Sequence, residues 1–264
     1  MNIVVCVKYV PDATADRQFE QDKTVDRDGV DGLLSELDEY AVEQALQLKE
    51  KAESPEDVKV IALTVAPEAG VDAVRKALQM GADSGVHVAD EAIAGSDAIA
   101  TSLVLAKAIE KIGDVDLVMC GMASTDGSMS VVPAMLAERL DLPQVTLASV
   151  IETQGDQVRV KRDGDVATEV IGATMPLVMS VTDQTGEARY PSFKGIMAAK
   201  KKPLETYTLS DLGVDAGDVG LSVAWTEVQD TTARPPRSAG EIVTDEDGSG
   251  ASALVDFLAS KKFI

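Results

Sequence analysis

The sequence predicts an α/β protein built on a doubly wound, mainly parallel sheet. Apolar runs that are typical of strands buried on both faces alternate along the chain with amphipathic segments of helical period. The chain has 264 residues but only four Phe, four Tyr and one Trp. Its core must therefore consist mainly of aliphatic side chains, which suits layered α/β packing better than an all-β sandwich.

The first part of the chain repeats a strand and a helix four times, which implies right-handed crossovers between parallel strands. Ser35 or Asp38 can cap the first helix, and Gly81 and Gly113 end the second and third. Residues 11–34 are polar and are expected to form a loop with a short ribbon. The predicted strands are residues 2–7, 58–65, 86–88 and 116–120. The predicted helices are residues 39–51, 69–80, 96–112 and 129–140.

From Gln144 the pattern changes to short alternating or β-branched segments separated by turns. Residues 145–151, 157–162 and 166–173 are expected to form an antiparallel meander added to the sheet. Residues 176–182 then form a last buried strand.

Composition and charge exclude several classes of function. The formal net charge of -21 argues against nucleic acid as a partner, because phosphate binding needs a basic face. Cys6 and Cys120 are isolated in apolar runs and are interpreted as reduced core residues, and His87 as a core or sheet-edge residue. No zinc or iron–sulfur ligand set, nucleophile elbow or Walker motif is present, so no catalytic or metal-ligating residues are expected.

No signal-type segment and no apolar stretch long enough to span a bilayer is found. We therefore expect a cytoplasmic protein without direct membrane insertion.

The loop after the fourth strand has the character of a phosphate site. In an open α/β sheet, ligands lie beyond the carboxyl ends of the strands, where backbone N–H groups at helix N-termini converge. Gly121 and Gly127 permit close backbone approach, and the ends of the first two strands would supply the other walls, at residues 6–7 and 65–66. The loop holds no lysine, which favours a monophosphate over ATP turnover. Hydroxyl donors come from Ser124, Thr125, Ser128 and Ser130. The alternative is that Ser and Asp here only cap the next helix.

Residues 189–202 concentrate five basic residues around an apolar tip, with no acid among them. Such a segment is typical of a docking surface, where charge steers the partner and an exposed apolar side chain anchors it. The alternative is a solvated loop that leads into a Lys-rich helix end. Beyond residue 203 the chain is polar and ends in a short apolar helix at residues 253–261, so this arm is expected to lie on another surface.

Four stretches resemble the beta subunit of the electron transfer flavoprotein, a family that includes the FixA proteins linked to nitrogen fixation. Residues 5–12 look like its first strand and the loop that follows, and residues 38–46 look like its first helix. Residues 75–83 are similar to its helix ending in Met-Gly-Ala-Asp. The most specific match runs from residue 160 to residue 202, and the whole resemblance covers residue 1 to at least residue 213.

The resemblance implies a Rossmann-like adenine-nucleotide-binding fold at residues 1–183, a partner-recognition loop at 184–202 and an arm at 203–264 that packs on an alpha subunit. It implies a heterodimer in which the alpha subunit holds most of the FAD and the beta subunit holds a structural AMP. The complex would carry electrons from acyl-CoA dehydrogenases of fatty acid β-oxidation, and other dehydrogenases, to a membrane-bound quinone oxidoreductase. By residue, the implied AMP pocket is Cys6, Ser35, Glu36, Leu37, Asp38, Val65, Gly121, Met122, Ala123, Ser124, Thr125, Asp126, Gly127, Ser128, Met129, Ser130, Val131 and Val132. The implied docking residues are Arg189, Tyr190, Phe193, Ile196, Met197, Lys200, Lys201 and Lys202.

Two positions depart from the family pattern. Phe193 stands where the family usually has Leu as the docking anchor, and Asp163 stands where it has a Glu that contacts the mobile flavin domain. Some family members split electron pairs and carry a second FAD in place of AMP; residues 126–131 differ from their loop sequence, which favours AMP. A stand-alone adenine-nucleotide sensor is the alternative from another class, and an ATP-consuming ligase would need a loop that is absent here.

Overall fold

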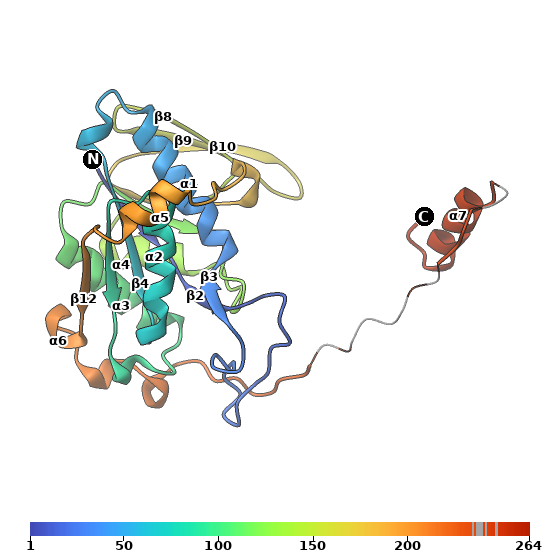
Figure 1. The fold of residues 1–264 in the computed structure, drawn as a ribbon, viewed down its shortest axis with the longest axis horizontal. Helices are drawn as coiled ribbons and strands as arrows, with labels where there is room; N and C mark the ends of the chain where they lie inside the picture. Colours follow the sequence, from blue (N-terminus) through green and yellow to red (C-terminus); the bar gives the residue numbers. More distant parts are fainter. Residues whose placement is uncertain (234, 236–239, 241, 246–247) are drawn as a thin grey trace. The chain divides into compact units, whose positions relative to one another are not determined.

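The computed structural model describes residues 1–233, 235, 240, 242–245 and 248–264. The chain forms two compact units, Met1–Asp230 and Thr231–Ile264 (Figure 1). No described helix is both long and apolar enough to cross a membrane.

The first unit is built around a seven-stranded sheet, which confirms the prediction of a doubly wound parallel sheet. Its strand order is β12-β5-β4-β1-β6-β11-β7, and every neighbouring pair is parallel. The strands are β1 (Asn2–Cys6), β4 (Lys59–Val65), β5 (Ser84–Val88), β6 (Leu117–Gly121), β7 (Gln144–Ala148), β11 (Leu177–Val181) and β12 (Leu204–Tyr207). Because β1 lies in the middle and the chain winds outward in both directions, the sheet is doubly wound.

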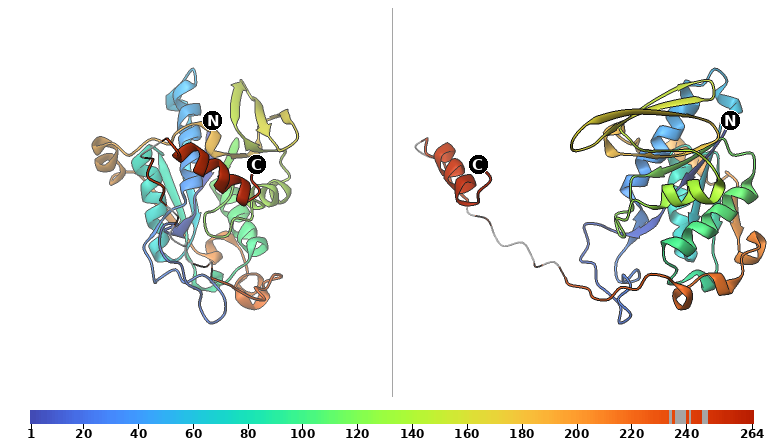
Figure 2. Two further views of the ribbon diagram at one scale, coloured as in Figure 1. Left: turned by 90° about the vertical axis from the view of Figure 1, so that its right-hand side faces the viewer. Right: turned by 180° about the vertical axis from the view of Figure 1, so that it is seen from behind.

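Helices cover both faces of this sheet, which explains why its strands are continuously apolar. Ile3 and Val5 contribute to the core beneath α1 and α2, whereas Val4 contributes to the core beneath α3 and α4. Figure 1 looks onto α1, α2 and α5, and the right-hand view of Figure 2 shows α3 and α4 on the other face. The α-helices of the first unit are α1 (Glu36–Lys51), α2 (Val71–Met80), α3 (Ala98–Ile112), α4 (Val132–Leu140), α5 (Phe193–Ala199) and α6 (Leu209–Leu212). Short 3-10 helices occur at Pro55–Asp57, Glu68–Gly70, Glu91–Ile93, Asp183–Thr185, Ala216–Asp218 and Leu221–Val223.

Helix ends follow the predicted signals in part. Gly81 and Gly113 end α2 and α3 with φ of 146° and 71°, a region that favours glycine. Ser35 is the N-cap residue of α1, but its hydroxyl makes no capping bond. The first helix begins three residues earlier than predicted, and α4 begins three residues later, at Val132.

The predicted meander exists, but it forms a separate sheet. Antiparallel strands β8 (Val150–Gln154), β9 (Gln157–Asp163) and β10 (Thr168–Thr174) pair in the order β10-β9-β8. The prediction of one strand over residues 145–151 is wrong, because β7 joins the parallel sheet and β8 the meander. The chain changes sheet near Leu147, where φ is 59°, and Ser149, whose N–H donates to the Lys161 carbonyl.

Residues 204–230, which the sequence assigned to the arm, belong to the compact first unit. The strand β12 pairs with β5 at the edge of the sheet, and a capping box between Thr208 and Asp211 starts α6. Asp97 then ties the end of the unit to α3: one carboxylate oxygen caps the helix, and the other accepts from the N–H groups of Trp225 and Thr226. The second unit contains α7 (Gly250–Ser260), close to the predicted helix at residues 253–261.

Candidate functional site

The carboxyl ends of β1, β4 and β6 lie side by side at one edge of the sheet. Cys6 pairs with Leu63 near the end of β4, and Val5 pairs with Met119 near the end of β6. The structure therefore brings together the three strand ends, at Cys6, Val65 and Gly121, that the sequence predicted as walls of one site.

Asp38 joins two of these strand ends through a buried carboxylate. One oxygen accepts from the Lys8 N–H at 2.8 Å, and the other accepts from the Gly121 N–H at 3.2 Å. A Cβ at residue 121 would lie only 2.6 Å from the Asp38 carboxylate and from the Leu37 carbonyl, so this position requires glycine. Burial raises the pKa of Asp38 to about 7, although the two N–H donors act in the opposite direction.

Residues 121–131, which we call the nucleotide loop after its predicted role, lead into α4 without capping it through a side chain. The N-cap residue is Val131, and no side chain caps the helix. The loop is instead organised by its own bonds, since Gly127 N–H donates to Asp126 at 2.7 Å and to the Ser124 hydroxyl at 3.3 Å. Ser128 and Ser130 adopt positive φ of 52° and 58°, which is a strained conformation for residues other than glycine. Helix capping therefore does not explain the conformation of this loop.

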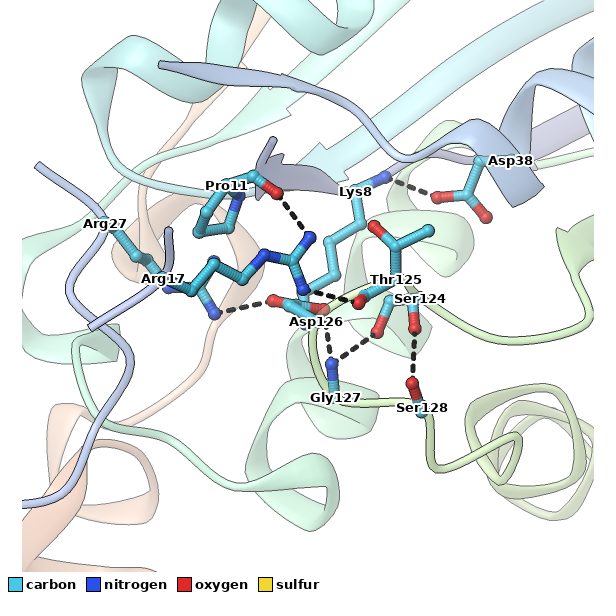
Figure 3. A network of polar contacts seen from close by, with 10 residues as sticks. All are labelled: Lys8, Pro11, Arg17, Arg27, Asp38, Ser124, Thr125, Asp126, Gly127 and Ser128. Atoms are coloured by element: carbon cyan, nitrogen blue, oxygen red, sulfur yellow. Dashed lines mark hydrogen bonds and ion pairs between the residues drawn. The ribbon is translucent and has the colours of Figure 1, made fainter. Parts of the chain in front are cut away.

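Charges from outside the loop converge on it, as Figure 3 shows. The Asp126 side chain is only 1% exposed and pairs with Lys8 Nζ at 2.9 Å and with Arg27 Nη2 at 2.7 Å. Burial would raise the pKa of Asp126, yet the Lys8 ammonium and the hydrogen bonds around the carboxylate hold it well below its ordinary value. Arg17 donates to the Thr125 carbonyl at 2.7 Å. The sequence analysis missed these cations, because it searched only the loop itself for positive charge.

Three hydroxyl groups at this edge are buried and have no hydrogen-bond partner among the described residues. They belong to Ser35, Thr64 and Thr125. Leaving a buried hydroxyl unpaired costs about 1–3 kcal/mol, so these three hydroxyls are available to bond a polar ligand or ordered water. Ser35 and Thr125 were predicted site residues, whereas Thr64 was missed; its signal was a polar residue near the end of an apolar strand. A sugar and phosphate group is rich in the donors and acceptors that these hydroxyls need.

The other predicted pocket residues lie at the same edge with graded exposure. Residues 127–130 are exposed, while Met122, Ala123 and Val132 are half-buried and Glu36 points to solvent. His87 is buried, and its Nε2 lies 3.0 Å from the Ala66 carbonyl, so it is a core residue as predicted. Both cysteines are free.

The predicted docking residues fall on and around α5. Tyr190 and Phe193 are 92% and 81% exposed, and Ile196 and Met197 are also exposed. Lys200 and Lys201 follow at the end of the helix, and their side chains make no hydrogen bond or ion pair to the described residues. These six residues, which we call the α5 patch, form an exposed surface that is both apolar and basic.

Two predicted docking residues are engaged within the chain instead. Arg189 donates to Glu43 at 2.6 and 3.1 Å and to Glu50 at 2.5 and 3.0 Å, which fastens the segment to α1. These hydrogen bonds and charges raise the pKa of the Arg189 guanidinium. Lys202 donates from Nζ to the Leu78 and Ala82 carbonyls at the end of α2, and burial lowers its pKa. These two charged side chains therefore hold residues 189–202 against α1 and α2.

Asp163, the predicted contact with a flavin domain, lies at the end of β9. Its carboxylate accepts from the hydroxyls of Ser149 at 2.5 Å and Thr168 at 2.6 Å. These two bonds lower the pKa of Asp163, so the group is an exposed anion with a fixed orientation.

The fold and this edge define a doubly wound α/β protein with a partly buried polar site at the carboxyl ends of its parallel strands. A family model described as the electron transfer flavoprotein domain matches residues 22–212. The chain is 44% identical over 266 residues to the electron transfer flavoprotein subunit beta of Mycobacterium leprae, which covers 100% of this chain and 99% of the relative. It is 37% identical over 265 residues to the protein of the same name from Thermoanaerobacterium thermosaccharolyticum, with 100% of both chains covered.

A third relative is the caffeyl-CoA reductase-Etf complex subunit CarD of Acetobacterium woodii, 33% identical over 265 residues and 100% of both chains. The chain belongs to the electron transfer flavoprotein family, as a relative of its beta subunits along its full length. The predicted resemblance and fold class are confirmed, and the role of the family is electron transfer.

Proposed function

We propose that this chain is the beta subunit of a heterodimeric electron transfer flavoprotein that holds a structural AMP at the carboxyl edge of its sheet. The partner is an alpha subunit that holds most of the FAD. The observation that supports AMP most directly is the set of three buried, unpartnered hydroxyls of Ser35, Thr64 and Thr125. FAD, when bound by the complex, supplies the electron-carrying chemistry, and this chain supplies position and electrostatics.

The nucleotide loop would receive the phosphate through its backbone N–H groups and hydroxyls. Lys8 lies beside the loop, but its ammonium is already paired with Asp126 at 2.9 Å. A monophosphate is therefore a better ligand than a triphosphate, whose higher charge would need free cations.

The electron donors would be acyl-CoA dehydrogenases and other dehydrogenases that dock on the α5 patch, and the acceptor a membrane-bound quinone oxidoreductase. A carrier must release each partner quickly, so a small surface with an apolar anchor and steering charge is suitable. Phe193 is the anchor in this proposal, and Lys200 and Lys201 provide the steering charge. Asp163 would contact the flavin-holding domain of the partner. We place the complex in the cytoplasm.

A second candidate is an electron-splitting complex with a second FAD in place of AMP. The similarity to a subunit of a caffeyl-CoA reductase-Etf complex favours it. To decide between them, the purified complex is denatured and its released nucleotides are separated by chromatography. AMP and FAD in equal amounts support the first proposal, whereas two FAD per complex support the second.

A further inference from the structure

Residues 12–31, which we call the strap, form a polar segment between two short strands. The strands β2 (Tyr9–Pro11) and β3 (Gly32–Leu34) pair antiparallel and close its root, where the Asp12 N–H also donates to the Asp31 carbonyl at 3.0 Å. The strap contains Arg17 and Arg27, and nothing in the proposed function yet uses them.

Arg17 joins the root of the strap to the nucleotide loop through one guanidinium group. It donates to the Pro11 and Thr125 carbonyls, each at 2.7 Å (Figure 3). It also donates to the Asp12 carbonyl at 3.2 Å. Because the guanidinium is planar and rigid, these three bonds fix the Thr125 backbone relative to the strap. The hydroxyl of the same residue, Thr125, is one of the three buried hydroxyls that have no hydrogen-bond partner among the described residues.

Arg27 acts on the next residue of the loop. It pairs with the Asp126 carboxylate at 2.7 Å, and Lys8 pairs with the other oxygen at 2.9 Å. A carboxylate in a loop that receives a phosphate would repel it unless opposite charges offset it. Two cations around one nearly buried carboxylate leave a net positive charge at this point of the loop.

We propose that Arg17 and Arg27 are positioning residues that hold the nucleotide loop in the shape and charge state needed for a phosphate group. The strap fixes Thr125 and neutralises Asp126, while the loop backbone itself takes the phosphate of an adenine mononucleotide. This inference rests on the proposed nucleotide function. The strap is expected to affect the binding of the phosphate group and not the binding of the nucleoside.

The test uses the heterodimer, stripped of AMP, with Arg17→Gln, Arg27→Gln and the double variant, and measures the affinities for AMP and for adenosine by calorimetry. Each single change is expected to weaken AMP binding by about tenfold or more, the usual effect of losing a charge-assisted hydrogen bond. Adenosine affinity should stay within about twofold, because adenosine has no phosphate to misplace. Arg27→Lys keeps the charge beside Asp126 and should restore most of the AMP affinity. Arg75→Gln, which removes an exposed pair with Asp72, is the matched control.

Unchanged AMP affinity in the double variant would overturn the inference while the nucleotide function stands. Equal loss of AMP and adenosine affinity would also overturn it, because the strap would then support the whole site rather than the phosphate. If the unaltered heterodimer binds no AMP, the proposed nucleotide function fails and the inference fails with it. If the double variant does not assemble, AMP affinity is compared between Arg27→Gln and Arg27→Lys heterodimers of equal melting temperature. Higher affinity in Arg27→Lys supports the inference, and equal affinity in the two variants overturns it.

Discussion

Asp38 is a buried carboxylate at the point where two strand ends meet the first helix. Its two oxygens accept from Lys8 and Gly121, and burial raises its pKa to about 7. An unfolded chain would titrate this group near 3.9. Between these two values the folded state binds more protons than the unfolded state, so the contribution of Asp38 to stability is full below about pH 4 and is lost as pH rises through about 7.

We expect Asp38→Asn to reveal this dependence. The free energy of unfolding of the unaltered chain, minus that of the variant, should be larger at pH 5 than at pH 8, by at most about 3 kcal/mol. Urea denaturation at both pH values measures it. Asp72→Asn, on the exposed face of α2, is the control and should show no such change. If this difference in the free energy of unfolding grew with pH instead, the pKa of Asp38 would not be raised in the folded state.

Phe193 is expected to govern docking without affecting the fold, because 81% of its surface is exposed. Phe193→Ala should lower kcat/KM for electron delivery by a dehydrogenase by about tenfold or more, as for an interface anchor. Flavin content and heterodimer formation should not change. Val166→Ala, at another exposed apolar residue, is the control. Loss of flavin in Phe193→Ala would instead make Phe193 a folding residue.

Residues 189–202 are held in place at both ends. Arg189 fastens one end to α1, and Lys202 fastens the other to the end of α2. Glu43 is only 7% exposed on its side chain, so its bond to Arg189 is shielded from water.

Arg189→Gln should therefore release this end of the segment. We expect a loss of about 1–3 kcal/mol in the free energy of unfolding and faster trypsin cleavage at Lys194, Lys200 and Lys201. Urea denaturation and timed proteolysis measure these effects. Arg162→Gln, which removes a pair with Glu169 on the meander, should leave the cleavage rate at these lysines unchanged. If both variants are cut at the same rate, Arg189 does not hold the segment.

The sequence predicts elements well where hydrophobic periodicity decides their structure. The buried strands β1, β4, β6 and β11 have no polar face and were recognised from their apolar runs. The edge strand β12 was missed, because only one side of an edge strand pairs and its residues are exposed or half-buried, so they form no apolar run. The break between β7 and β8 was missed because both halves have the same β-branched pattern and the change of sheet depends on tertiary packing.

Of the candidate site, the nucleotide loop could be predicted from the sequence, whereas the residues that contact it from elsewhere in the chain could not. Glycines and hydroxyl residues after a buried strand indicated the nucleotide loop, since this position in an α/β sheet is a general one. Nothing local indicated that Arg17 and Arg27 would reach the loop, because they are 108 and 99 residues away from their partners in the chain. Thr64 was likewise hidden in an apolar run.

The chain has one large unit with its own core and a small unit whose described residues form no buried core. In the described part of the second unit, the apolar side chains of Leu254, Val255 and Phe257 are more than half exposed. We propose that this arm packs on the alpha subunit, which would cover these side chains.

A chain that ends at Asp230 should then fold but fail to pair. We expect its melting temperature to stay close to that of the full chain alone, and its affinity for the alpha subunit to fall at least tenfold. Calorimetry and size-exclusion chromatography with the purified alpha subunit measure the two effects. Normal pairing by the shortened chain would show that the arm is not part of the interface.

We propose that this chain holds AMP at the carboxyl edge of its sheet, within a heterodimer that carries electrons on FAD. The most direct test is to purify the complex that forms around this chain, denature it, and quantify the nucleotides it releases. We expect one AMP and one FAD for each pair of chains. A complex that releases ATP, or a solitary chain that releases no nucleotide, would contradict it.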